Sequence, residues 1–315
     1  MVKFLKAEGY WVRGVDVKEP EYEASAAHEF RLLDLREWQN CLDATEGVSE
    51  VYQLAADMGG IGYITAFHAD VARNNVLINA HMLEAAHRNG VEAHFFSSSA
   101  CVYPMYRQET PDVTPLKEEH AYPADPEEGY GWEKLYAEKL CRYYREEGKL
   151  LTTVARFHNI YGPLGTYDGG REKAPAAICR KVAAARDGDE ILVWGDGAQT
   201  RSFTYVEDCV EGIHRIVRSG HPEPLNLGTD ELISVDELVD LVCSIAGKSL
   251  QKRHDTSKPQ GVRGRNSDNT RLREVLKWEP GTQLATGLKD TYAWIEAEMR
   301  REGRSHVLAG RGAEA

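Results

Sequence analysis

Short apolar runs and longer segments with helical periodicity alternate along most of the chain. The apolar runs predict strands over residues 11–17, 30–36, 51–56, 93–96, 150–157, 190–194, 203–206 and 225–228. The remaining periodic segments predict helices over residues 1–8, 68–89, 130–147, 176–185, 207–218, 235–246, 270–276 and 286–301. Because strands that alternate with helices pair in parallel, this pattern predicts an α/β fold with a doubly wound sheet.

The longest predicted helix, over residues 68–89, carries an apolar stripe. Four of its residues recur at helical spacing: Ala72, Val76, Ala80 and Leu83. A stripe of this kind is typical of a helix face that packs on a core. We therefore expect these side chains to be buried and to take no part in a binding site.

Composition and charge narrow the class of protein. The chain has 315 residues, 42% of them hydrophobic, which suits one large domain with a smaller one appended. The formal net charge of -12 argues against a nucleic-acid surface, because phosphate neutralisation needs clustered Lys and Arg. The six cysteines form no Cys-x-x-Cys pair, which predicts reduced thiols without a metal site, and no apolar run approaches the roughly 18 to 20 residues of a membrane span. We expect a cytoplasmic enzyme without nucleic-acid or membrane partners.

A titratable pair opens the helix predicted from residue 130. Tyr130 and Lys134 are four residues apart and share one helix face. An ammonium beside a phenol favours the phenolate, so we expect Lys134 to lower the pKa of Tyr130 and to make it a base for a hydroxyl proton. The spacing alone is weak evidence, but Ser99 ends a predicted strand about thirty residues upstream, at the sheet edge where cofactors bind.

This arrangement of Ser99, Tyr130 and Lys134 resembles the extended short-chain dehydrogenase/reductase superfamily, whose members act mostly on nucleotide sugars. The resemblance implies a Rossmann domain that binds NAD over residues 1–165, which also receives parts of 200–228. It implies a smaller α+β domain, mainly for substrate, over residues 166–315. Its NAD contacts are Asp16, Asp34, Ala55, Tyr130 and Lys134. Asp16 ends the second strand of the fold, where an acidic residue accepts hydrogen bonds from ribose hydroxyls and selects NAD.

The resemblance also implies a first strand and a Gly-x-x-Gly-x-x-Gly turn ahead of the helix at residues 1–8. There, backbone N–H groups meet the cofactor pyrophosphate. The sequence begins inside that helix. A missing first strand would open the centre of the sheet and leave its two neighbours with unpaired edges. We therefore expect Met1 to be a misassigned start or a truncation, with roughly 20 more residues in the working protein.

Longer stretches resemble one family within the superfamily, the GDP-mannose 3,5-epimerases. The similar segments are 55–60, 98–104, 130–134, 156–162, 169–175, 194–197, 199–204 and 261–269. The similarity covers nearly the whole chain, from residue 1 to about residue 300. Such a set of long matches is far more specific than a Tyr-x-x-x-Lys pair. The resemblance implies epimerisation of GDP-mannose at C3 and C5 to GDP-L-galactose, or at C5 alone to GDP-L-gulose, with bound NAD.

The chemistry of that reaction gives a reason for two unusual residues. Oxidation at C4 yields a ketone that acidifies the C–H bonds of C3 and C5, and inversion needs proton removal from one face and delivery to the other. Two acid/base groups are therefore required besides Tyr130, and the resemblance assigns these roles to Cys101 and Lys173. A thiol with a pKa near ~8.5 can take and give protons at neutral pH, whereas Lys173 must be partly desolvated to bring its pKa down from ~10.4.

The resemblance further implies a GDP-sugar site and a homodimer formed through the two helices that flank the Tyr130 face. Its substrate contacts are Gly59, Ser99, Ala100, Cys101, Asn159, Glu172, Lys173, Ala174, Lys181, Gln199, Thr200, Arg201, Arg263 and Arg265. Gly59 lies in a Gly-rich segment directly after a strand, where backbone can approach a ligand closely. Arg263 and Arg265 stand beside glycines and suit bidentate diphosphate contacts, although a flexible basic loop has the same composition.

Two other functions fit parts of the sequence. A nucleotide-sugar 4-epimerase or 4,6-dehydratase shares Ser99, Tyr130 and Lys134 but needs no Cys and Lys pair. A 4,6-dehydratase is expected to carry an acidic pair where Ala100 and Cys101 stand. A catalytically dead protein that binds sugar nucleotides would fit the absent glycine turn, but such a binder has no physical need for the retained catalytic side chains.

Overall fold

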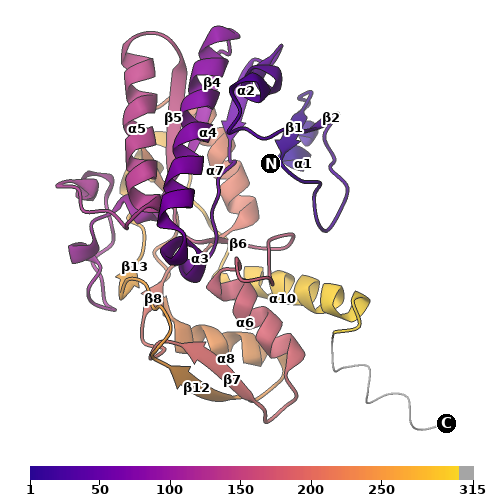
Figure 1. The fold of residues 1–315 in the computed structure, drawn as a ribbon. Helices are drawn as coiled ribbons and strands as arrows, with labels where there is room; N and C mark the ends of the chain where they lie inside the picture. Colours follow the sequence, from indigo (N-terminus) through magenta and orange to yellow (C-terminus); the bar gives the residue numbers. More distant parts are fainter. Residues whose placement is uncertain (305–315) are drawn as a thin grey trace.

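The computed structural model describes residues 1–304. Its central element is a parallel sheet of four strands in the order β10-β5-β4-β3. These strands are β3 (Glu50–Gln53), β4 (Ala93–Ser99), β5 (Leu151–Phe157) and β10 (Leu225–Leu227). Figure 1 labels two of them, β4 and β5. Strand β4 runs past the predicted apolar residues through three serines, so its carboxyl end reaches Ser99.

A second parallel sheet pairs β1 (Arg13–Asp16) with β2 (Glu29–Leu32). Within residues 1–304, β1 and β3 each pair with one strand only, so β1 and β2 form a sheet separate from the four-stranded one.

Helices cover both faces of the four-stranded sheet. Phe96 packs in one buried cluster with α2 (Trp38–Thr45), α4 (His68–Arg88) and α5 (Tyr130–Glu146). Phe95 packs in another with α7 (Val206–Ser219) and α9 (Thr270–Leu276). Neighbouring residues of a strand point to opposite faces, so these two phenylalanines hold helices on both sides of β4. The short helix α1 (Val2–Ala7) lies against α7 through Phe4 and His214, whose ring centroids are 5.3 Å apart. The predicted doubly wound α/β fold is confirmed.

Helix α4 confirms the predicted helix, but its buried face is not the predicted stripe. Val76 is exposed and only Leu83 of the four stripe residues is buried. Three amides lie on the buried face instead: Asn74, Asn75 and Asn79. The prediction for Val76 is wrong because hydrogen-bonded polar side chains fill positions that the periodicity reserves for apolar ones.

The rest of the chain forms a second core of helices and short strands (Figure 1). Its main elements are α6 (Ala174–Ala184), β7 (Glu190–Trp194), β8 (Thr200–Arg201), β11 (Ile233–Ser234), α8 (Val235–Ala246), β12 (Gln251–Asp255), β13 (Gly264–Arg265) and α10 (Leu284–Arg301). A short pair, β6 (Ile160–Tyr161) and β9 (Thr204–Tyr205), lies outside the large sheet. Strand β12 pairs with β7 but was not predicted, because its sequence Gln-Lys-Arg-His-Asp has no apolar residue.

Two short segments complete the carboxyl edge of the four-stranded sheet. The Gly-rich loop after β3 leads into α3 (Ile61–Ala66), and a single 3₁₀ turn (Ala100–Val102) follows β4. No helix of residues 1–304 has both the length and the low polarity needed to span a lipid bilayer.

Candidate active site

Ser99 and Tyr130 meet at the carboxyl edge of β4. Ser99 caps the 3₁₀ turn, and its Oγ accepts a hydrogen bond from the Cys101 N–H at 3.2 Å. Tyr130 is the first residue of α5 and is buried. Its hydroxyl is close enough to Ser99 for the serine side chain to favour the ionised phenol, although burial outweighs this effect on the pKa. The fold therefore brings together two hydroxyl groups that are 31 positions apart in the sequence.

Lys134 lies one turn further along α5 and is 1% exposed. Its Nζ donates a hydrogen bond to Ser97 O at 2.9 Å and stands 5.5 Å from the centroid of the Tyr130 ring. An ammonium has three N–H donors, and Ser97 O is the one acceptor it has within residues 1–304. A buried cation with donors to spare suits ribose hydroxyls, so this position fits a nucleotide cofactor at the strand ends.

The phenol of Tyr130 is not the ready base that the sequence predicts. Burial raises its pKa well above the usual range, and the charges of Cys101 and Glu133 act in the same direction. The predicted lowering by Lys134 is wrong because burial outweighs it, and burial also lowers the pKa of Lys134 itself. Tyr130 therefore needs a further positive charge in the site before it can act as a base.

A buried carboxylate follows Tyr130 on the same helix. Glu133 accepts hydrogen bonds from Asn75 Nδ2 at 2.9 Å and from Asn79 Nδ2 at 3.1 Å, both on α4. The Oδ1 of Asn75 accepts a hydrogen bond from the Asp57 N–H at 2.6 Å. Burial raises the pKa of Glu133 to about 7. This network ties the helix that carries Tyr130 to the loop after β3.

Cys101 and Lys173 belong to the same cluster. Cys101 lies in the 3₁₀ turn after β4, and Lys173 caps the N-terminus of α6. Burial lowers the pKa of Lys173, and the charge of Cys101 is the strongest that opposes this. The predicted desolvation of Lys173 is confirmed. Burial raises the pKa of Cys101 to about 11, so the ordinary thiol value near ~8.5 that the sequence analysis uses is wrong.

The segment that carries Lys173 packs on the Gly-rich loop after β3. The Gly60 N–H donates a hydrogen bond to Arg171 O at 3.0 Å. A Cβ on Gly60 would lie 2.5 Å from Glu172 O, so the two backbones approach this closely only with glycine there. The Arg171 guanidinium lies over the Tyr63 ring, 3.9 Å from its centroid. These contacts fix Lys173 relative to the edge of the sheet.

Arg201 and Arg265 are paired across β8 and β13. Arg265 is 6% exposed, and its Nη1 lies 3.5 Å from Cys101 Sγ. Arg263 precedes β13 and binds Asp196 Oδ1 at 2.9 Å at the surface. Pairing of β13 with β8 buries Arg265 against the thiol, so the diphosphate role that the resemblance implies for Arg265 stays a prediction. The run is no flexible basic loop.

The other predicted substrate contacts lie on the elements around this cluster. Several already hydrogen-bond to backbone carbonyls: Asn159 to Ser202 (2.9 Å), Lys181 to Leu192 (2.8 Å), Gln199 to Trp194 (2.8 Å), Thr200 to Pro111 and Arg201 to Val262 (2.7 Å). Glu172 accepts from the Gly170 N–H at 2.7 Å. Gly59, Ala100 and Ala174 have no polar side-chain group, so any hydrogen bond from these residues to a ligand uses the backbone.

The predicted NAD contacts other than Tyr130 and Lys134 lie at or just beyond the carboxyl ends of parallel strands. Asp16 ends β1, Asp34 follows β2 and Ala55 follows β3. The Asp34 carboxylate accepts a hydrogen bond from Arg36 Nε at 2.9 Å, which lowers its pKa. Strand ends at this edge are where dinucleotides bind in such folds, so the donors and acceptors present fit the cofactor.

Comparison with known proteins identifies the family. The model of the NAD dependent epimerase/dehydratase family matches residues 1–228. The chain belongs to this family. NAD is therefore its cofactor, and the family resemblance predicted from the sequence is confirmed.

Within the family, the chain is 47% identical over 311 residues to GDP-mannose 3,5-epimerase 1 of Oryza sativa subsp. japonica, with 98% of this chain and 81% of that protein covered. It is 48% identical over 301 residues to GDP-mannose 3,5-epimerase of Arabidopsis thaliana, with 95% and 79% covered. The crystal structure of UDP-glucose 4-epimerase from Thermotoga maritima matches with a TM-score of 0.83 and 24% identity over 95% of this chain and 94% of that one. The match to UDP-glucose 4-epimerase shows only that the two proteins share a fold.

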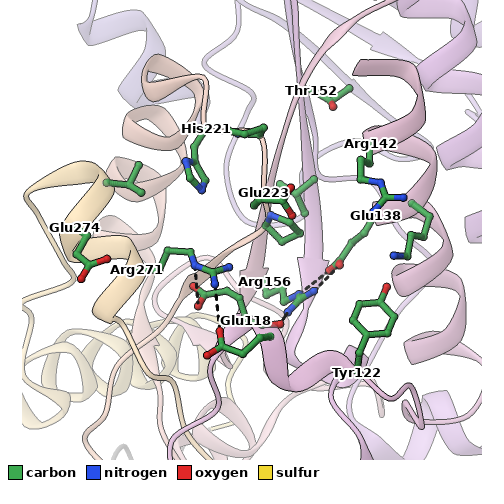
Figure 2. Close-up of a pocket in the computed structure, with 16 residues that line it drawn as sticks. Glu118, Tyr122, Glu138, Arg142, Thr152, Arg156, His221, Glu223, Arg271 and Glu274 are labelled. Carbon is green, nitrogen blue, oxygen red and sulfur yellow. Dashed lines mark hydrogen bonds and ion pairs between the residues drawn. The ribbon is translucent and has the colours of Figure 1, made fainter. Parts of the chain in front are cut away.

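A cavity of about 600 Å³ lies elsewhere in this family member, between α5, β5 and α9 (Figure 2). The ion pair of Arg156 and Glu138, at 2.8 Å, lines it, and Arg271 binds Glu119 at 3.2 Å. None of the predicted catalytic residues lines this cavity. We place the active site of the family member at the cluster around Tyr130 instead, because the cavity's arginines are already paired with carboxylates.

Sequence reasoning missed two carboxylates of the site. Glu127 and Glu133 stand three residues on either side of Tyr130. Both are largely buried, whereas Glu128 between them is exposed. Their symmetric spacing about Tyr130 was a visible signal, but nothing in the sequence distinguishes them from the solvated Glu128.

Proposed function

We propose that the chain inverts C3 and C5 of GDP-mannose to give GDP-L-galactose, or GDP-L-gulose when C5 alone is inverted. The observation that carries the proposal is that Cys101 packs with Tyr130 in one buried cluster, next to Ser99, while Lys173 is close enough to feel the charge of the Cys101 thiol. Inversion next to a ketone needs two acid/base groups besides the one at the carbinol oxygen. The names of the relatives that are 47% and 48% identical support the same substrate.

Tyr130 removes the proton of the C4 hydroxyl, and Ser99 orients that oxygen by a hydrogen bond. The chemistry that NAD supplies when bound is uptake and return of the C4 hydride beside a positively charged ring. Such a charge opposes the burial that raises the pKa of Tyr130. Lys134 binds the cofactor ribose with the N–H donors that Ser97 leaves free.

Once C4 is a ketone, Cys101 and Lys173 exchange protons with C3 and C5. One group removes a proton from one face of the ring, and the other delivers a proton to the opposite face. Burial lowers the pKa of Lys173, so its amine serves as base as well as acid. Burial raises the pKa of Cys101, which makes its thiolate a strong base. Tyr130 finally returns its proton to the C4 oxygen.

Positive side chains near β7 and β8 hold the anionic part of the substrate. Arg263 lies partly exposed before β13, and Lys181 and Arg201 lie on neighbouring elements. The chain has a formal net charge of -12, so a diphosphate must be met by such local cations rather than by the overall field. Arg263 exchanges its bond to Asp196 for the diphosphate in this proposal.

The same proposal includes a homodimer formed through α4 and α5, which lie side by side (Figure 1). Large apolar side chains are exposed on these two helices: Val76, Leu77, Trp132, Tyr136 and Tyr143. Exposed apolar side chains on adjacent helices suit a self-complementary interface. A Tyr136→Glu variant that sediments at the same mass as the wild type would remove this part of the proposal.

Substitution of the acid/base pair tests the proposed function. We expect Cys101→Ser and Lys173→Met each to lower the rate of GDP-L-galactose formation by about 10² or more, because each removes a proton-transfer group. NAD binding should be unchanged in both. Cys243→Ser, a second buried cysteine in α8, is the matched control and should keep full activity. Retained activity in Cys101→Ser would exclude the proposed pair and favour a 4-epimerase.

A further inference from the structure

The structure points to a role for two residues that flank the thiol of Cys101. We propose that Glu127 and Arg265 are positioning residues that set the proton affinity of Cys101 from opposite sides, the carboxylate strengthening its hold on the proton and the guanidinium weakening it. This inference rests on the proposed function, in which Cys101 must both remove and deliver protons. It assigns Arg265 to the acid/base chemistry of the site.

The two groups touch the thiol and each other. Arg265 Nη1 lies 3.5 Å from Cys101 Sγ, and Arg265 Nη2 lies 3.5 Å from Glu127 Oε2. The Glu127 carboxylate lies close enough to the same sulfur for its negative charge to raise the pKa of the thiol. The side chains of Arg265 and Glu127 are only 7% and 12% exposed. Solvent therefore screens their charges weakly.

Backbone contacts fix this geometry. The Glu127 N–H donates a hydrogen bond to Cys101 O at 3.0 Å. A Cβ on Gly131 would lie 2.3 Å from the same carbonyl, so the first turn of α5 packs directly on the 3₁₀ turn. On the other side, Arg265 Nε donates a hydrogen bond to Gln108 Oε1 at 2.5 Å. The thiol is thus held between a carboxylate and a guanidinium on rigid supports.

One nitrogen of the Arg265 guanidinium has no hydrogen-bond partner among residues 1–304. Arg265 Nη2 is buried and makes no hydrogen bond to any residue of the described chain, since its distance to Glu127 is too long for one. An unpaired buried donor is costly, and a thiolate at Cys101 would offer it a negative partner. Glu127 therefore favours the protonated thiol of Cys101, and Arg265 favours the thiolate.

Other charged groups face the thiol from every side. Tyr130 and Lys134 approach from α5, Lys173 from the start of α6, and Arg201 from β8. After burial, Glu127 is the strongest influence that raises the pKa of Cys101, and Arg265 the strongest that lowers it. Substitutions at these two positions should therefore move thiol ionisation in opposite directions while the other charges stay in place.

The first test measures the thiol without catalysis. Alkylation of Cys101 by iodoacetamide, followed by mass spectrometry of its peptide at several pH values, reports the thiolate fraction. Glu127→Gln should raise the alkylation rate near pH 8 about tenfold, and Arg265→Gln should lower it about tenfold, because a neighbouring charge shifts a pKa by about one unit or more. Glu128→Gln removes the same charge at an exposed position and should match the wild type. An unchanged rate in Glu127→Gln overturns the inference.

The second test separates this inference from the proposed function. The pH at which deuterium exchange into the sugar is half-maximal should fall by about one unit in Glu127→Gln. A shifted alkylation rate without any exchange in the wild type would support control of the thiol and overturn the proposed function. Exchange in the wild type together with an unchanged pH profile in Glu127→Gln would support the proposed function and overturn control of the thiol by Glu127. Circular dichroism at each pH confirms that a variant is folded.

Discussion

The buried carboxylate of Glu133 makes folding stability depend on pH, and Glu133→Gln removes that dependence. Burial raises the pKa of Glu133 from 4.5 to about 7, and its hydrogen bonds to Asn75 and Asn79 only partly oppose this. The unfolded chain therefore loses this proton at lower pH than the folded protein does. As the pH rises between these two values, ionisation of the carboxyl stabilises the unfolded state but not the folded state. Stability present at low pH is then lost.

The size of the loss follows from the two pKa values. Between about pH 5 and about pH 8, linkage removes about 2.5 kcal/mol of unfolding free energy from the wild type. Glutamine has no proton to lose, so Glu133→Gln keeps that free energy. At low pH the variant should be less stable by about 1–3 kcal/mol, because its amide cannot accept from both asparagines. At high pH this difference should disappear or reverse.

Equilibrium urea unfolding of both proteins, followed by tryptophan fluorescence at the two pH values, measures this crossover. All other titrating groups are common to the two proteins, so the difference between them isolates Glu133. Glu128→Gln carries the same charge change at an exposed position and should show no crossover. A difference between the wild type and Glu133→Gln that is equal at both pH values would refute the reasoning.

Two further substitutions test the packing that supports the site. Gly60→Ala places a Cβ 2.5 Å from Glu172 O, so it should displace the segment that carries Lys173 and lower kcat about tenfold or more. Gly281→Ala is the control, because there is open space around Gly281, and it should leave kcat unchanged. Equal kcat values in the two variants would contradict this. Arg156→Met leaves Glu138 charged and buried, so we expect a loss of about 3–5 kcal/mol in urea unfolding. Adding Glu138→Gln should restore part of that loss, and a double variant less stable than Arg156→Met would argue against a buried charge as the cause.

The fold class and most helices could be predicted from the sequence because their signals are local. The segment predicted over residues 270–276 coincides with α9, and the one predicted over 130–147 ends one residue beyond α5. Strand β12 could not be predicted, because it has no apolar residue and exists by pairing with β7. The stripe on α4 failed at Val76 because contacts from other elements decide which face is buried. The domain boundaries stay a prediction.

Some residues of the candidate active site could likewise be predicted from the sequence, and others could not. Residue types, together with the family resemblance, were enough to name Tyr130, Cys101 and Lys173. The roles of Glu127 and Glu133 could not be predicted, because their partners come from distant parts of the chain, as in the hydrogen bond that joins Glu133 to an asparagine 58 positions away. The pKa of Tyr130 was predicted in the wrong direction, and the rise in the pKa of Cys101 was not predicted, since burial is a property of the assembled fold.

The central claim is proton exchange at two carbons of one sugar by the pair Cys101 and Lys173. Incubation of GDP-mannose with the protein and NAD in D₂O, followed by proton NMR and mass spectrometry of the recovered sugar nucleotides, measures it directly. We expect deuterium at C3 and at C5, none at C4, and loss of inversion at both carbons in Cys101→Ala. Recovered sugar without deuterium at either carbon, from protein that binds NAD, would contradict the account.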